Sequence, residues 1–178
     1  MSKIKLTKGE LKRQRDSLEQ FRHYLPTLQL KKQQLQMQIT EAYRLMDDRR
    51  EVLNKKIEEI SRWTRLLADR NVDLAEWITP ERISVDAVNI AGVNVPVYSG
   101  IHFKDAAYDF YSTPLWIDKG IEELRLMVTY LARIDVLEKR INILKHELRI
   151  TTQRVNLFEK IKIPECLENI RVIRIYLG

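Results

Sequence analysis

The feature that most constrains the fold of this chain is a heptad repeat of apolar residues in its first half. Counted in sevens from Leu11 to Leu67, eight of nine a positions are apolar, and so are five of the eight d positions from Gln14 to Trp63. A register held over eight heptads without a slip is typical of a long helix in a left-handed coiled coil. Such a helix needs a partner helix along its apolar seam. The expected seam residues in the first part of the helix are Leu11, Leu18, Phe21, Leu25, Leu28 and Leu35.

A proline stands inside this pattern. Pro26 removes the hydrogen bond to the carbonyl of Arg22 and clashes with that turn, which costs about 3 kcal/mol. The helix could end near Tyr24 and restart, or it could continue with a kink. Because the heptad register is unchanged across Pro26, the sequence favours a kink.

A second helical block is expected after Ser112 or Thr113, with Pro114 in its first turn and Pro164 at its close. Its apolar spacing is three or four residues, except for two successive steps of three between Leu131 and Leu137, a stammer that overwinds a coiled coil. The expected stripe is Ile121, Leu124, Val128, Leu131, Ile134, Leu137, Ile141, Leu144, Leu148, Thr151, Val155 and Phe158. A final segment has helical spacing at Leu167, Ile170, Ile173 and Leu177.

Between the two blocks the apolar residues alternate instead. In "ISVDAVNIAGVNVPVYSGIHF", Val and Ile at a period of two predict two strands, and "NIAG" predicts the turn that joins them. A single hairpin is marginal in water, so it must lean on its own helices or on another protein. The residues expected to make such partner contacts are Ile90, Gly92, Val93, Val95 and Pro96.

Together these segments predict a mainly α fold, a long antiparallel two-helix coiled coil with a small cap region that contains the β-hairpin. The expected divisions are a first long helix over residues 1–78, a connector over residues 79–111, and a second long helix with a terminal segment over residues 112–178. A bare two-helix coil has no third layer, so burial and backbone ordering nearly cancel and its stability should be modest.

Charge is distributed unevenly along the chain. Residues 1–32 hold nine Lys/Arg and three Asp/Glu, a net +6, and residues 139–178 hold nine and four, a net +5. The middle, residues 33–138, holds thirteen and eighteen, a net −5. If the ends meet, one tip of the molecule concentrates a charge of +11, which concerns its partners more than its fold.

Residue patterns that carry chemistry are missing from the sequence. The five glycines form no phosphate-binding loop, and the three histidines have no neighbours at metal-ligand spacing. The sequence therefore predicts no catalytic, cofactor or metal site. Cys166, the single cysteine, is expected to be a small buried residue in a reducing compartment. No apolar run reaches the length of a membrane span, and the first residues lack the apolar core of a signal peptide, so neither feature is expected.

The basic ends leave several classes of protein open. They could be a solvated face, a nucleic-acid-binding surface or part of a scaffold coiled coil. Against nucleic-acid binding, no aromatic residues interleave with the basic ones, as they do in single-strand binders, and no helix-turn-helix or zinc-finger spacing appears.

Four segments carry a family resemblance: "YLPTLQLKKQQLQ" (24–36), "NIAGVNVPVY" (89–98), "STPLWIDKGIEEL" (112–124) and "TTQRVNLFEKIKIPECLENIRVIRIYLG" (151–178). In this order they resemble the D subunits of the V/A-type rotary ATPases. The resemblance covers nearly the whole chain, and the last segment is the most specific.

This resemblance implies a central rotor shaft without a catalytic site or cofactor. It implies partners as well: a ring of catalytic A and regulatory B subunits, the small F subunit, and a membrane rotor reached through an adaptor. The chain would then be cytoplasmic and peripheral to the membrane. The basic tip would enter the ring, and the expected ring contacts are Lys12, Arg13, Arg15, Arg149, Thr151, Thr152, Gln153, Arg154 and Asn156.

Overall fold

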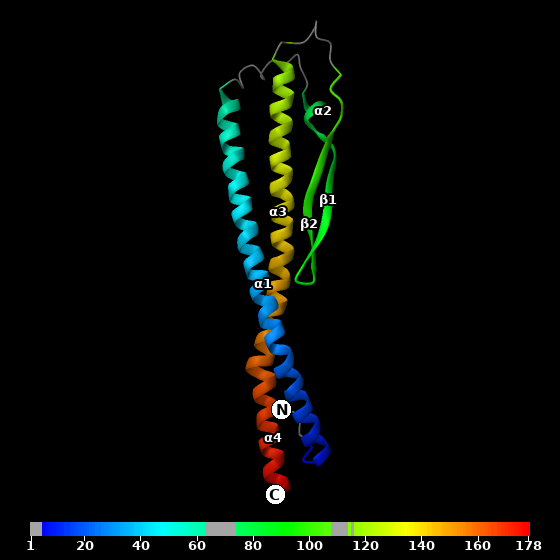
Figure 1. Ribbon diagram of the computed structural model, residues 1–178, viewed down its shortest axis with the longest axis vertical. Helices are drawn as coiled ribbons and strands as arrows, with labels where there is room; N and C mark the ends of the chain where they lie inside the picture. Colours follow the sequence, from blue (N-terminus) through cyan, green and yellow to red (C-terminus); the bar gives the residue numbers. More distant parts are fainter. Residues whose placement is uncertain (1–4, 63–73, 108–113, 115) are drawn as a thin grey trace. The chain divides into compact units, whose positions relative to one another are not determined.

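The structure, a computed structural model, describes residues 5–62, 74–107, 114 and 116–178. Long helices precede and follow a short helix and a β-hairpin along the chain (Figure 1), which confirms the predicted mainly α fold. The elements are α1 (Lys8–Ser61), α2 (Ala75–Ile78), β1 (Pro80–Ile90), β2 (Val93–Phe103), α3 (Ile117–Leu157), the π-helical turn η2 (Phe158–Lys162) and α4 (Ile163–Leu177). No helix formed by the described residues is both long and apolar enough to cross a membrane.

The chain divides into two compact units. The first comprises residues 1–37 and 145–178, and the second comprises residues 38–144. In the first unit, Lys31 Nζ donates a 2.7 Å hydrogen bond to Glu147 Oε1, and the rings of Phe21 and Phe158 lie 5.0 Å apart. Moving backwards along α1 therefore moves forwards along the partner segment, so the two run antiparallel.

The heptad positions form the least exposed face of α1. Every described a and d position from Leu11 to Ile60 is buried or half-buried, whereas Trp63 and Leu67 lie outside the described residues. On the partner segment, Leu144 and Val155 are buried, and Leu148 and Phe158 are half-buried. The heptad positions therefore identify the face of α1 that packs, because side chains seven residues apart lie on the same side of a helix.

Neither of the two prolines ends the helical run in which it lies. α1 continues from Lys8 to Ser61 with Pro26 inside it, so a helix end near Tyr24 is wrong. Pro164 does not close the second block either, because α4 carries on to Leu177. The π-helical turn just before Pro164, in which Ile163 N–H bonds to Phe158 O, shifts the hydrogen-bond register where the proline lacks a donor.

Two other expected helix features are wrong in detail. Helix α3 begins at Ile117 and not at Pro114, which contributes only its carbonyl to the 3.1 Å bond from Ile117 N–H, and Ser112 and Thr113 lie outside the described residues. In the final segment Leu167 and Leu177 are exposed. The buried stripe of α4 is formed by Cys166, Ile170 and Ile173.

The second unit adds a third layer to the helix pair. Here α3 lies between α1 and the hairpin (Figure 1). Its core contains Ala42, Met46, Leu53, Ile134 and Ile141. Because α3 is covered on two sides, its buried surface is wider than one stripe.

One residue of the predicted stripe is exposed and not buried. Leu131, inside the expected stammer, is 52% exposed. Ala132 and Val136, in contrast, are buried. The expectation for Leu131 is wrong because Tyr130, four residues before Ile134, packs against the core instead. A regular spacing of three and four is thus kept by Met127, Tyr130, Ile134, Leu137 and Ile141.

The hairpin closes on the predicted turn. β1 and β2 pair antiparallel, with Ile90 opposite Val93. Ala91 and Gly92 have φ angles of 49° and 80°, the left-handed values that a type I′ turn requires. Asn89 stabilises the turn, since its Oδ1 accepts a 3.1 Å hydrogen bond from Gly92 N–H.

Candidate functional site

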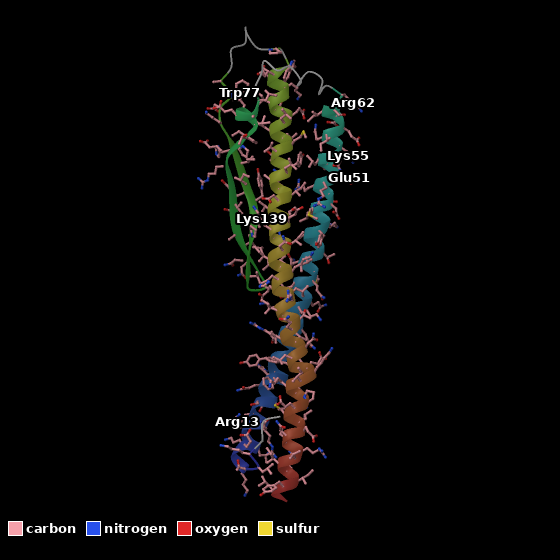
Figure 2. The ribbon with its side chains drawn as sticks, turned by 180° about the vertical axis from the view of Figure 1, so that it is seen from behind. Arg13, Glu51, Lys55, Arg62, Trp77 and Lys139 are labelled. Carbon is pink, nitrogen blue, oxygen red and sulfur yellow. The ribbon has the colours of Figure 1, made fainter. Side chains whose placement is uncertain are left out.

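The first unit carries a basic outer surface. Residues 1–37 and 145–178 hold sixteen Lys/Arg and seven Asp/Glu, a net charge of +9. Arg13 projects from α1 (Figure 2), with 77% of its side chain exposed beside Glu10. Lys12, Arg15, Arg149 and Arg154 are exposed as well. The helix pair thus gathers the expected basic side chains in one compact unit.

One residue of the expected ring-contact set does not belong on this surface. Thr151 is 1% exposed, so its side chain faces the interior of the helix pair. Thr152 is half-buried, while Gln153 and Asn156 are exposed. Thr151 falls on the same seven-residue repeat as Leu144, which places it in the seam, and a direct contact to another subunit is wrong for it.

The hairpin residues also separate into two groups. Val95 is 1% exposed and cannot reach a partner protein, so the expectation of a partner contact at Val95 is wrong. Ile90, Val93 and Pro96 are half-buried, and Gly92 is exposed at the turn. The difference arises because β2 lies against the helices of the second unit, whereas all residues of β1 except its ends and Ser84 are exposed.

Arg125 is a positioning residue that the sequence did not reveal. From α3, its Nε donates a 2.8 Å hydrogen bond to Trp77 O, and its Nη2 donates a 2.5 Å bond to Lys104 O. The guanidinium also lies 5.2 Å from the ring centroid of Phe103. One side chain of α3 therefore binds the segments that flank the hairpin on both sides, α2 before β1 and Lys104 after β2. Its sequence position, between Leu124 and Leu126, gives no sign of this role.

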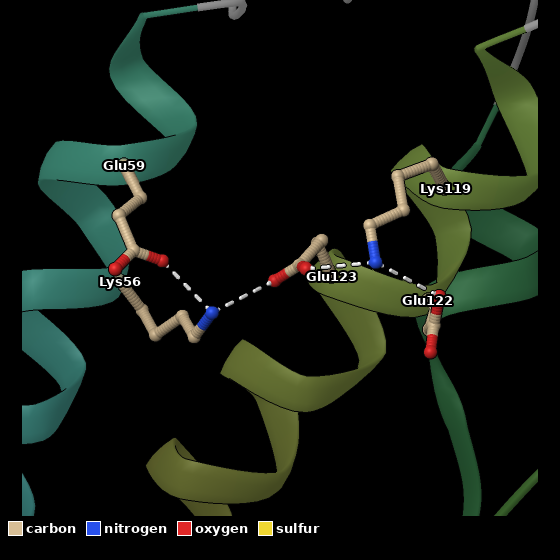
Figure 3. Close-up of polar contacts among 5 residues, drawn as sticks. All are labelled: Lys56, Glu59, Lys119, Glu122 and Glu123. Atoms are coloured by element: carbon tan, nitrogen blue, oxygen red, sulfur yellow. Dashed lines mark hydrogen bonds and ion pairs between the residues drawn. The ribbon is translucent and has the colours of Figure 1, made fainter.

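Ion pairs join α1 and α3 in the second unit. Lys56 Nζ lies 2.8 Å from Glu59 Oε2 and 3.5 Å from Glu123 Oε2 (Figure 3), and Glu123 also pairs with Lys119 at 3.3 Å. The hydrogen bond from Lys56 lowers the pKa of Glu59, and the same bond raises the pKa of Lys56. Exposed pairs such as Glu51 with Lys55 (Figure 2) follow the same pattern within α1 alone.

Nothing in the described part of the chain resembles a metal centre. No group of three or more His, Cys, Asp or Glu side chains there is placed to hold an ion. Cys166 is buried in α4, and burial raises the pKa of its thiol, as for a packing residue.

These features define a class of protein: an antiparallel helix pair that presents charged surfaces and a β-hairpin to its surroundings. The chain belongs to the family of ATP synthase D subunits, whose sequence model matches residues 10–178. It is 44% identical to the V-type ATP synthase D subunit of Borreliella burgdorferi, over all of this chain and 88% of that protein. It is 36% identical to the protein of the same name from Chlamydia caviae, over 99% of this chain and 86% of that protein.

Proposed function

We propose that this chain is the central rotor shaft of a V/A-type rotary ATPase, a non-catalytic subunit that transmits torque. Torque would pass between ATP hydrolysis or synthesis in a ring of A and B subunits and ion movement in the membrane sector. Its membership of the D-subunit family is the observation that carries this proposal. The unbroken 54-residue helix α1, paired along an apolar seam, supports a role in carrying torque.

The basic surface of the first unit is the proposed contact with the ring. Long Lys and Arg side chains suit a shaft that meets several environments in turn, because their flexible stems adapt while the charge stays in water. The residues that keep this assignment are Lys12, Arg13, Arg15, Arg149, Thr152, Gln153, Arg154 and Asn156. Carboxylates on the inner wall of the ring would help to select the rotor angle.

Other partners are proposed for the remaining surfaces. The exposed turn of the hairpin at Gly92, with Ile90, Val93 and Pro96 beside it, would contact a neighbouring subunit, and the small F subunit would bind the shaft. An adaptor would connect the shaft to the membrane rotor. The chain would then work on the cytoplasmic side, peripheral to the membrane.

Charge neutralisation tests the proposed ring contact. Replacing Lys12, Arg13, Arg15, Arg149 and Arg154 by Gln should weaken assembly with A and B subunits by about tenfold or more at low salt, because exposed opposite charges steer and orient association. The matched control neutralises five exposed basic residues of the second unit, Arg44, Lys55, Arg62, Arg82 and Lys139. Equal assembly and equal ATPase coupling for both variants would contradict the proposal, as would binding to DNA in place of the ring subunits.

A further inference from the structure

A cavity in the second unit is lined by arginines and apolar side chains. It lies where α1, α3 and β2 meet, with a volume of about 420 Å³. Three arginines line it, Arg49 from α1 and Arg133 and Arg140 from α3. Apolar side chains such as Leu45, Val97 and Leu137 form other parts of its wall.

The charge of this cavity is uncompensated. None of the described residues that line it is acidic. Two of the arginines have neutral contacts: Arg133 lies over the ring of Tyr98 at 5.0 Å, and Arg140 Nη2 donates a 3.2 Å hydrogen bond to Gln38 Oε1. Three positively charged side chains that line one partly enclosed space repel one another, and an anion among them would offset this repulsion.

Two buried donors strengthen this point. The Nε atoms of Arg133 and Arg140 are buried without a hydrogen-bond acceptor among the described residues. Leaving a charged donor buried and unsatisfied is costly. Elsewhere in the same unit the fold supplies a carboxylate: Arg50, next to Arg49 in the sequence, bonds to Glu138 Oε1 at 2.6 Å. Arg133 and Arg140, in contrast, have no carboxylate partner among the described residues, and their contacts are with Tyr98 and Gln38.

We infer that this cavity receives an Asp or Glu side chain, flanked by apolar residues, from another subunit of the assembly. A guanidinium group binds a carboxylate through two parallel hydrogen bonds, and several such groups can share its oxygens. The apolar part of the wall favours a peptide segment over a free anion, since a phosphate ion would leave Leu45, Val97 and Leu137 against water. The inference rests on the proposed function only in that the partner is a subunit of the same complex.

Site-directed photo-cross-linking in the assembled complex tests this inference. Ser99, exposed at the cavity, is replaced by p-benzoylphenylalanine, and the complex is reconstituted with the other ATPase subunits, irradiated and mapped by mass spectrometry. We expect adducts in one segment of one subunit, with an Asp or Glu beside apolar residues. The same probe at Asp86, exposed on β1, is the control and should give at least tenfold less of this adduct.

Arginine variants show whether charge is the cause. In the complex, Arg49→Gln/Arg133→Gln/Arg140→Gln should lower the yield of the adduct about tenfold, whereas the corresponding Lys variants should retain more of it. If the triple variant fails to fold, Arg49→Gln alone is used, with an expected threefold loss. Arg50→Gln is the matched control and should leave the yield unchanged. An unchanged yield in the Gln variants, or an adduct segment without a carboxylate, would overturn the inference.

A free anion is the competing occupant. Inorganic phosphate is added to the isolated chain and to its Arg49→Gln variant, and thermal unfolding is followed. A Tm that phosphate raises only in the wild-type chain would assign the cavity to a free anion and overturn the docking of a side chain. The docking inference and the rotor proposal can fail separately. A cross-linked adduct in a complex that does not rotate would contradict only the rotor proposal. Rotation without an adduct would contradict only the docking inference.

Discussion

The two units use the same pair of long helices but bury them to different extents. Among the described residues, the first unit has six buried side chains, whereas the second has thirteen. The first has a net charge of +9 over residues 1–37 and 145–178, and the second has fifteen Lys/Arg and eighteen Asp/Glu, a net −3. The first unit is a helix pair only, while the second also contains the hairpin.

This difference shows how one coiled-coil pattern can serve two purposes. In the second unit the hairpin lies on α3 and supplies the third layer that a helix pair lacks, so more apolar surface is removed from water. In the first unit the same pattern yields a thin seam with charged side chains around it. Stability should therefore depend mostly on the second unit, and the charge-dependent contact with the ring mostly on the first.

The sharpest test of this difference compares two apolar deletions. Ile141→Ala removes a 3% exposed side chain from the core of the second unit and should lower the free energy of unfolding by about 2–5 kcal/mol. Leu148→Ala, at a half-buried seam position in the first unit, should cost roughly half as much. Chemical denaturation measures both. Equal losses would contradict the view that the second unit carries most of the stability.

A charge placed at Thr151 tests the thin seam. Thr151→Asp buries a carboxylate inside the helix pair and should cost at least about 2 kcal/mol more than Gln153→Asp, because Gln153 is exposed and the new charge stays in water. Both variants change the charge of the same basic unit by the same amount. Thermal unfolding measures both variants. If the two substitutions lower the Tm equally, Thr151 does not face the interior.

Attachment of the third layer can be weakened at one residue. Arg125→Ala removes the bonds to Trp77 O and Lys104 O, and we expect a loss of about 2 kcal/mol, with faster amide hydrogen exchange in β1 and β2. Arg125→Lys should retain part of the effect through one bond. Unchanged exchange in both strands of Arg125→Ala would show that the hairpin is held by its apolar contacts alone.

Substitutions in the hairpin turn should change the stability of the hairpin by a smaller amount, in opposite directions at the two positions. Ala91→Gly should raise the stability of the hairpin by about 0.5–1 kcal/mol, since Ala91 has φ of 49°, whereas Gly92→Ala, at φ of 80°, should lower it by about 1 kcal/mol. Hydrogen exchange at the strand amides reports both changes. The same sign for the two substitutions would contradict the type I′ turn.

The smallest effect concerns pH. The pKa values of Glu59 in the second unit and Glu168 in the first are lowered by hydrogen bonds from Lys56 and Arg171. A carboxyl group with a lowered pKa stabilises the fold at neutral pH, and this contribution is lost as the pH falls through about 5 to 3. The Tm of the wild-type chain should therefore fall slightly more over this range than that of Glu59→Gln. Since both groups are exposed, a large difference would be unexpected.

The sequence predicts the parts of this fold that depend on periodicity. The seam from Leu11 to Ile60 and the turn at Ala91–Gly92 follow from periods of seven and two, which local geometry imposes. Leu131 differs from expectation because Tyr130 takes its place against the core. Pro164 differs because the hydrogen-bond register changes before it, and Thr151 because it lies on the seam and not on the outer face. Arg125 and the arginine cavity come from long-range contacts, which no spacing in the sequence records.

The most direct test of the rotor proposal is to watch the chain turn. In a complex reconstituted with its A, B and F subunits, the ring is fixed to a surface, and a reporter bead is attached through Asp86→Cys in a Cys166→Ser background, since Asp86 is exposed. We expect added ATP to drive sustained rotation of the bead in one direction. ATP hydrolysis by the ring with a bead that stays still, although the chain remains bound, would contradict it.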